Sequence, residues 1–285
     1  MPAKQHQPLW LIPNLLSLDA PLVAVTWLYI FAKTWRVQYL PWVAYLSLGL
    51  VVWVIYVTDR LLDASLKGAI SGKLEARHAF HYKHQRTFRR LAVMASAAAL
   101  VLVIKGMPVS IYGYAVFGGL MTAGFFALSF FSTQGPDDIP YAKNVLAGLA
   151  FAYGTAMIAF VFTGFELWEF IQSRELICFA VLCVLNISAI DLWEHANRFV
   201  DPEIKATDEL ALTLPLTLLG AAALVFALQD HGLTTRPFFY AILTGAGLLY
   251  ILNRSRGRFQ MDALRVLADV ALLVPFLVFT ASSRS

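Results

Sequence analysis

Two groups of acidic side chains lie where apolar segments of the chain give way to polar ones. Asp59 and Asp63 are four residues apart, so on a helix both carboxylates share one face. Asp191 with Glu194, or with His195, makes a similar arrangement further along the chain. Carboxylates at this spacing suit Mg²⁺, which proteins hold through a few carboxylates together with substrate phosphate oxygens. The plainer interpretation is that these are helix-end charges that reach lipid headgroups.

Basic side chains follow the first acid pair. They are Arg60, Lys67, Lys73, Arg77, Lys83, Arg86, Arg89 and Arg90. Acids that hold a metal beside bases that hold phosphate form a common arrangement for a metal–diphosphate site. A cytoplasmic loop of a membrane protein is also rich in Lys and Arg for reasons of topology alone, so both interpretations stay open.

The elements that must position these side chains are membrane-spanning helices. Of the 285 residues, 59% are hydrophobic and 14% are charged, whereas soluble domains usually carry charges at about a quarter of positions. A spanning helix needs roughly 20 predominantly apolar residues, and runs of this kind predict nine helices. These are 18–34, 40–58, 91–105, 110–131, 142–164, 174–190, 208–229, 237–253 and 262–281. No linker divides them, so we predict one all-α polytopic membrane domain, 1–285.

The distribution of Lys and Arg predicts how these helices are oriented. With the N-terminus in the cytoplasm, most of the 22 Lys and Arg residues fall on the cytoplasmic side. The exceptions are Lys33, Arg36, Lys105, Arg174, Arg236 and Arg284. Because cytoplasmic loops carry an excess of such residues, we expect the N-terminus and both acidic segments to be cytoplasmic and the C-terminus to lie on the opposite side. The net charge of +4 suits anionic membrane lipid and requires no nucleic-acid partner.

The order of these features resembles the UbiA superfamily of intramembrane prenyltransferases. That family has nine helices and two Asp-rich motifs, on helices two and six, which face the cytoplasm. The segment Asp59-Arg60-Leu61-Leu62-Asp63 is similar to the last two acids of the first motif, and the segment from Asp191 to His195 is similar to the second. The segment from Lys143 to Gly154 is similar to the stretch that opens helix five of the family.

The chain departs from the family pattern at three positions. Ile55 and Tyr56 stand where the family has Asn and Asp. His195 stands where the last Asp of the second motif is expected, although Glu194 could substitute for it. Fewer carboxylates should weaken Mg²⁺ binding, so these departures bear on catalysis more than on the fold.

The resemblance implies a Mg²⁺-dependent enzyme that moves a prenyl chain from a polyprenyl diphosphate to an aromatic or other apolar acceptor. Asp59, Asp63 and Asp191 would hold Mg²⁺ and, with Lys143, form the catalytic group. The expected substrate-binding residues are Arg60, Arg77, Tyr56, Asn144, Glu194, His195 and Arg198. The alternative is a non-catalytic relative that binds isoprenoid or quinone-like lipid, which the missing motif acids favour. A transporter is a third class, but acids at span ends rather than at mid-membrane count against it.

Three histidines repeat at intervals of three, at His78, His81 and His84. Imidazole is a metal ligand, but this spacing drifts around a helix, so a single three-His site would be strained. We prefer an amphipathic basic helix in the membrane interface, with Phe80 and Phe88 as apolar anchors.

Two further pairs are expected to be structural. Arg265 and Asp269 are four apart inside the last span, where buried charges need partners, so we expect them to form an ion pair. Cys178 and Cys183 fall in one apolar run, five residues apart, and are expected to be packed in the interior rather than bonded to each other.

Overall fold

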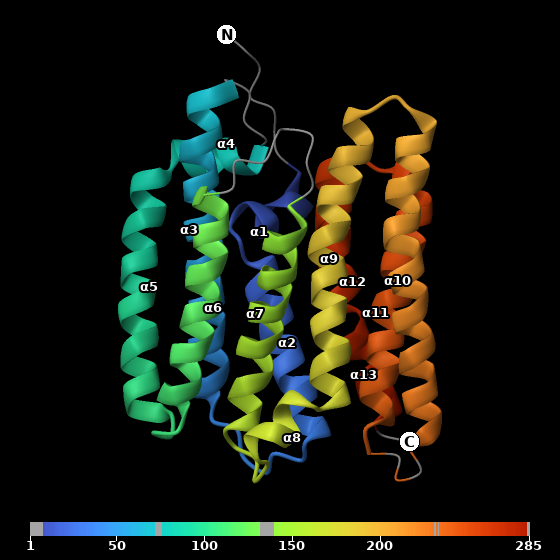
Figure 1. The fold of residues 1–285 in the computed structure, drawn as a ribbon. Helices are drawn as coiled ribbons and strands as arrows, with labels where there is room; N and C mark the ends of the chain where they lie inside the picture. The colour runs from blue at the N-terminus through green and yellow to red at the C-terminus, as the bar shows by residue number, and fades with distance from the viewer. Residues whose placement is uncertain (1–7, 72–75, 132–139, 231, 233, 284–285) are drawn as a thin grey trace. The chain divides into compact units, whose positions relative to one another are not determined.

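A computed structural model describes residues 8–71, 76–131, 140–230, 232 and 234–283, with the side chains of 64–71, 76–79 and 131 outside the description. Within these residues every regular element is a helix (Figure 1). The all-α prediction is confirmed to that extent. The chain divides into two compact units. Unit 1 comprises Met1–Ala24 and Trp42–Met107, and unit 2 comprises Val25–Pro41 and Pro108–Ser285.

Unit 1 is built on two long helices, α3 (Trp42–Ser71) and α5 (Gln85–Gly106), which pack against each other. The apolar, Pro-free sequence of α3 lets it continue as one helix through the first acid pair. The shorter helix α4 (Ala76–Lys83) contacts both. Before them in the chain come η1 (Leu9–Leu11), α1 (Ile12–Leu15) and the first turn of α2 (Asp19–Thr34).

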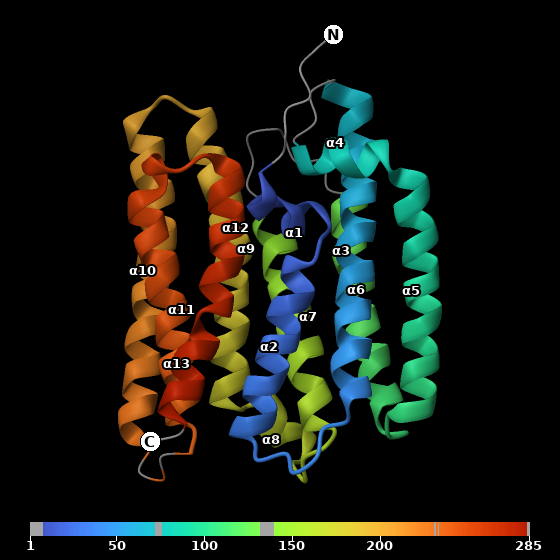
Figure 2. The same cartoon turned by 180° about the vertical axis from the view of Figure 1, so that it is seen from behind.

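Unit 2 contains the rest of α2 and all later helices. These are α6 (Ile111–Phe131), α7 (Tyr141–Phe160), α8 (Leu167–Ile171), α9 (Arg174–Arg198), α10 (Pro202–Gln229), α11 (Arg236–Ser255), η2 (Arg256–Arg258), α12 (Met261–Leu273) and α13 (Pro275–Ser282). Helix α9 packs on α7, α10, α11 and α12, so it is the centre of this unit (Figures 1 and 2).

The interior of unit 2 holds a cluster of aromatic side chains. The Trp27 ring stacks on Phe179 with centroids 4.4 Å apart and meets Phe238 edge-on at 5.7 Å. The Trp27 indole N–H donates to the Leu272 carbonyl at 2.9 Å, which satisfies its one polar group. These contacts join α2, α9, α11 and α12 in one apolar core.

Seven helices in the described residues are long and apolar enough to cross a membrane. They are Trp42–Asp63, Gln85–Gly106, Ile111–Phe130, Tyr141–Phe160, Arg174–Arg198, Pro202–Gln229 and Met261–Ser282. Leu9–Leu15 and Asp19–Thr34 pass the same test only as a pair bent by 79°. Helix α11, which covers the predicted span 237–253, is not among the seven. The chain is consistent with a multi-pass membrane protein, but the predicted count of nine spans is not confirmed.

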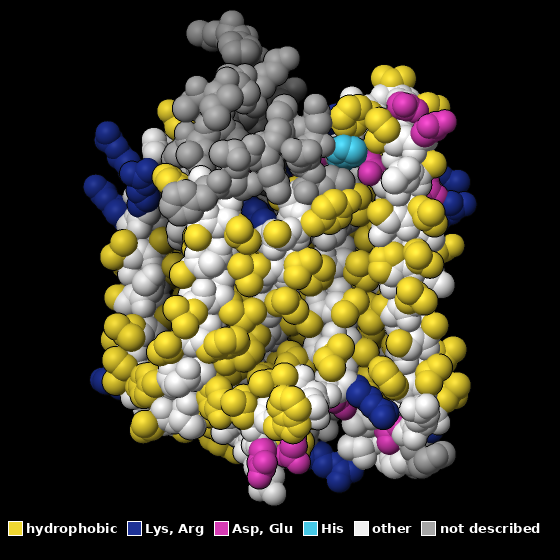
Figure 3. All heavy atoms as spheres, viewed as in Figure 1, with side chains coloured by type: hydrophobic (Ala, Val, Ile, Leu, Met, Phe, Trp, Pro, Cys, Tyr) yellow, Lys and Arg dark blue, Asp and Glu magenta, His cyan; other side chains and the backbone are white. Residues whose placement is uncertain are grey.

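The surface of α10 has the distribution expected of a helix that faces lipid. Hydrophobic side chains cover the length of this helix in Figure 3, and charged side chains gather toward its two ends. Large apolar residues are exposed along the whole helix, at Leu210, Leu214, Leu218, Leu224, Val225 and Leu228. A contiguous apolar surface of this length indicates contact with a membrane rather than with water.

Candidate functional site

The first acid pair lies on α3 in unit 1. Asp59 and Asp63 are one helical turn apart and both are partly exposed. Tyr56 lies on the same face, three residues before Asp59, and is half-buried. The regular helix therefore places the two carboxylates as their spacing predicts, with an aromatic ring beside them.

Arg60, expected to bind phosphate, is 6% exposed and is engaged by the N-terminal segment of unit 1. Its guanidinium donates to the Asn14 carbonyl and lies 3.7 Å from the Asp19 carboxylate. The Asn14 side-chain amide also donates to Asp19. A buried guanidinium is costly unless it is paired in this way, so Arg60 holds the N-terminal segment against α3.

His81 is fully buried in unit 1 and contacts Ser17, with the ring nitrogen 3.3 Å from the hydroxyl oxygen. Its ring stacks on Phe88 with centroids 4.3 Å apart, and Phe88 is itself only 5% exposed. The expectation that Phe88 anchors an interfacial helix in lipid was therefore wrong, because this ring faces the protein interior. His84 donates from Nδ1 to the Phe80 carbonyl at 3.0 Å. The side chains of His78 and Arg77 lie outside the described residues.

The segment that opens α7 meets the second acid motif in unit 2. Gly148 allows this approach, because a Cβ at that position would lie 2.5 Å from Val184 Cγ2 and 2.6 Å from the Val184 nitrogen. One turn earlier, the Asn144 amide donates to the Asp191 carboxylate at 2.8 Å. The sequence placed Asn144 and Asp191 in one site, and the structure brings them into contact.

Lys143, the neighbour of Asn144, turns its ammonium toward α6. The Lys143 nitrogen lies 5.1 Å from the centre of the Phe125 ring, a cation–π distance. The start of α7 therefore contributes one amide and one cation to the same end of unit 2. We call this end, defined by Asn144, Asp191, Asp208 and Arg265, the Asp191 end.

Glu194, expected to bind substrate, is paired with Arg265 of α12. The Arg265 guanidinium donates to one Glu194 oxygen from two nitrogens, at 2.6 and 3.2 Å, and to Asp262 at 2.9 Å. Arg198 lies 3.8 Å from the other Glu194 oxygen. The sequence singled out Arg265 and Glu194 separately but did not pair them and did not suggest Asp262, and the pairing of Arg265 with Asp269 stays a prediction.

His195 contacts Asp208, a residue that the sequence did not suggest. The His195 Nδ1 lies 2.7 Å from an Asp208 oxygen, and the two side chains are 17% and 6% exposed. Asp208 lies in the second turn of α10, thirteen residues after His195 and across the bend that joins α9 to α10. It lies among Glu203, Lys205 and Glu209 in the polar opening of α10, so the sequence carries no signal that singles it out.

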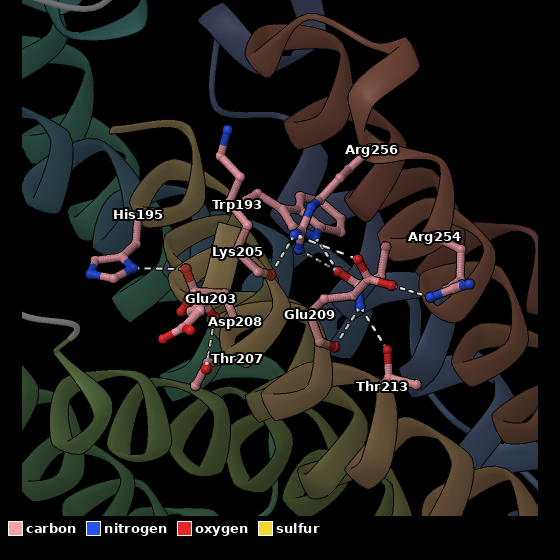
Figure 4. A network of polar contacts seen from close by, with 11 residues as sticks. Trp193, His195, Glu203, Lys205, Thr207, Asp208, Glu209, Thr213, Arg254 and Arg256 are labelled. Carbon is pink, nitrogen blue, oxygen red and sulfur yellow. Dashed lines mark hydrogen bonds and ion pairs between the residues drawn. The ribbon is translucent and has the colours of Figure 1, made fainter. Parts of the chain in front are cut away.

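A second polar network joins α9, α10 and α11 beside this contact (Figure 4). The Asn253 side chain accepts from the Trp193 indole at 2.9 Å and donates to the Glu209 carbonyl at 3.0 Å. The Glu209 carboxylate pairs with Arg254 and lies 3.7 Å from Arg256. Because Asn253 is only 1% exposed, this network fixes the rotation of the helices that carry Glu194, His195 and Asp208.

The residues of the Asp191 end fit a Mg²⁺ ion only in part. No three Asp, Glu, His or Cys side chains gather as metal ligands in the part of the chain that the structure describes. Glu194 and Asp208 are already engaged by Arg265 and His195. Mg²⁺ commonly uses one or two carboxylates and completes its coordination with water and substrate phosphate, a role that Asp191 can fill.

At the opposite end of unit 2, which we call the Asp230 end, the Asp230 carboxylate is held by groups close to it in the sequence, while Arg36 donates to the Thr234 hydroxyl from 198 residues away. The Asp230 carboxylate accepts from the backbone N–H groups of Thr235 and Arg236 at 2.6 and 2.8 Å, and from the Thr235 hydroxyl at 3.0 Å. Burial alone would raise the pKa of Asp230, but these hydrogen bonds outweigh it and hold the pKa below its usual value. A cavity of about 510 Å³ lies at this end, between the Trp35, Phe165 and Glu175 side chains.

Comparison with known protein families, with curated proteins and with solved structures finds no match to this chain. The resemblance of the sequence motifs to UbiA-type prenyltransferases therefore stays a prediction. Of these, the α7 segment and the second acid motif come into contact within unit 2.

Proposed function

We propose that this chain is a multi-pass membrane protein that binds a polyprenyl diphosphate and transfers its prenyl chain to an aromatic or other apolar acceptor. The Asp191 end of unit 2 would hold part of the donor's diphosphate. The observation that carries this proposal is the Asn144–Asp191 hydrogen bond, which fixes a carboxylate at the start of α7, where Lys143 is the neighbour of Asn144 and where α7 and α9 approach through Gly148.

Each of these groups would have a distinct part in donor binding. Asn144 orients the Asp191 carboxylate, and Lys143 supplies a positive charge for phosphate. Asp191 would hold Mg²⁺, and the ion would supply positive charge for the leaving diphosphate. The use of Asp59 and Asp63 for the same ion stays a prediction from the sequence.

A non-catalytic relative that binds isoprenoid or quinone-like lipid is the second candidate. The Glu194–Arg265 contact favours it, because this acid of the second motif is neutralised by a cation of the protein itself. Such a protein would bind an apolar chain without breaking the bond to diphosphate.

A transfer assay separates the two candidates. The purified protein in lipid nanodiscs would be incubated with Mg²⁺, radiolabelled prenyl diphosphates of several lengths and a panel of quinone precursors. The enzyme proposal predicts a labelled, diphosphate-free product. Asp191→Asn should reduce its yield at least about tenfold, because the substitution removes a carboxylate that would hold Mg²⁺ against the diphosphate. Glu203→Gln, an exposed acid on α10, is the matched control. Retention of an intact labelled lipid without any product would instead support the binding protein.

A further inference from the structure

The contact between His195 and Asp208 has the geometry of a histidine held by a carboxylate. Its length of 2.7 Å is short for a hydrogen bond between nitrogen and oxygen, as charge-assisted pairs are. An ionised carboxylate only accepts, so His195 donates from Nδ1. Nε2 is then the nitrogen that can accept a proton, and Figure 4 shows it turned away from Asp208.

Helix capping does not explain the position of Asp208. The cap of α10 is Asp201, whose side chain accepts from the Glu203 backbone N–H at 2.9 Å. Asp208 lies further along the helix, where it is 5% exposed. A buried carboxylate is costly unless it is partnered, and the partner that the structure gives it is His195.

The His195 ring also lies beside the proposed donor site. His195 follows Asp191 by four residues on α9, so the two side chains share one helical face. Phe199 follows the last residue of α9 in extended conformation, and its ring centroid lies 4.8 Å from the imidazole, an aromatic surface against which a flat acceptor can pack. The His195 side chain is 17% exposed, so its ring is not sealed from a ligand.

We propose that His195 and Asp208 form an acid–base dyad in which Nε2 of His195 takes the proton that the acceptor loses when it is prenylated. This inference rests on the proposed function. The bond between the prenyl carbon and the diphosphate oxygen breaks, and its electron pair leaves with the diphosphate. A new bond forms between that carbon and the acceptor, and the acceptor's proton moves to His195. Asp208 is a positioning residue that holds the imidazole tautomer and its orientation.

The tautomer can be measured without any substrate. The full chain would be labelled with ¹⁵N-histidine in detergent micelles, and His195→Gln would assign the His195 signals among the six histidines. At alkaline pH the dyad predicts a proton on Nδ1 and none on Nε2. Asp208→Asn should abolish this preference. A His195 that carries its proton on Nε2 in the wild type would overturn the dyad.

The transfer assay then tests its role. His195→Gln should slow transfer about 100-fold or more, the range that a general base contributes, while donor binding is retained. Asp208→Asn should slow transfer as well, Asp208→Glu should recover part of the rate, and Glu203→Gln should match the wild type. If Asp208→Glu recovers the transfer rate, the carboxylate acts by positioning His195. Thermal unfolding of the same variants would show whether either substitution instead disturbs helix packing.

The outcomes distinguish this inference from the function on which it rests. Wild-type rates in both His195→Gln and Asp208→Asn would overturn the dyad and leave the proposed function intact. Loss of prenyl diphosphate binding in both variants would show that His195 binds that substrate, and this result would also overturn the dyad. Absence of transfer by the wild-type protein would overturn the proposed function and the dyad together.

Discussion

Both ends of unit 2 are rich in polar contacts, but their central carboxylates are held in different ways. At the Asp230 end, one carboxylate accepts from groups five and six residues further along the chain. At the Asp191 end, the partners come from different helices, as in Asn144–Asp191, separated by 47 residues, and Glu194–Arg265, separated by 71. The first arrangement closes a loop, whereas the second holds charged side chains at fixed positions where several helices meet.

This difference indicates where a ligand site belongs. A carboxylate such as Asp230 accepts from the backbone N–H groups of a nearby turn, and its hydrogen bonds are complete once that turn forms. A cluster assembled from α7, α9, α10 and α12 forms only when the whole bundle packs, and it brings together a cation, an amide, carboxylates and an imidazole. Such convergence of polar groups is typical of binding and catalytic sites.

Cysteine labelling tests whether the two ends lie on opposite sides of the membrane. Lys205→Cys and Gly232→Cys introduce thiols at exposed positions of the two ends, while native Cys178 and Cys183 are buried. The excess of basic residues at the Asp191 end predicts that position 205 is labelled only from the cytoplasm and position 232 only from the other side. Labelling of both from one side would contradict the expected orientation.

Removal of Arg265 should have the largest effect on stability. Arg265→Met removes the buried cation of Glu194 and leaves it the exposed Arg198 at 3.8 Å, and breaking a buried pair in this way costs roughly 3–5 kcal/mol. Thermal unfolding in detergent measures the change. The control is Arg265→Met with Glu194→Leu, which removes both charges and should recover most of the loss. Equal stability of Arg265→Met and the wild type would show that the pair does not hold the Asp191 end.

Gly148→Ala should disturb the approach of α7 to α9. The added methyl would lie within 2.7 Å of Val184 backbone atoms, so the helices must separate, and overpacking of this kind costs about 1–3 kcal/mol. Gly154→Ala is the matched control on the same helix, because a Cβ there meets no atom within 4 Å. We expect lower thermal stability and weaker donor binding for Gly148→Ala alone. A tolerated Gly148→Ala would rule out this close approach.

Asp230→Asn should have the smallest effect, and that effect should depend on pH. Because the folded state holds the pKa of Asp230 below its usual value, its stabilising contribution is present above about pH 4 and is lost as pH falls through the folded pKa. The melting temperature of the variant should therefore fall below that of the wild type at pH 7, and the two should converge in acid. A difference that grows as pH falls would contradict the assigned hydrogen bonds.

The sequence predicted an all-helical membrane protein and joined Asn144 and Asp191 in one site. The first follows from composition and from the length of the apolar runs, whereas the second is what the resemblance to UbiA-type prenyltransferases implied. It missed Asp208 and the Glu194–Arg265 pair, because such contacts depend on the rotation of separate helices about their axes. It also placed Phe88 in lipid, since helical periodicity shows that a face is apolar but not whether protein or membrane covers it.

Donor binding by the wild type and Asp191→Asn tests the central claim most directly. Isothermal titration in nanodiscs would measure the affinity for a non-hydrolysable prenyl diphosphate with and without Mg²⁺, using Glu203→Gln as the control. We expect Mg²⁺-dependent binding by the wild type and the control, and binding at least about tenfold weaker, or about 1.4 kcal/mol, in Asp191→Asn. Equal affinity in all three proteins, or no dependence on Mg²⁺, would contradict a diphosphate site at the Asp191 end.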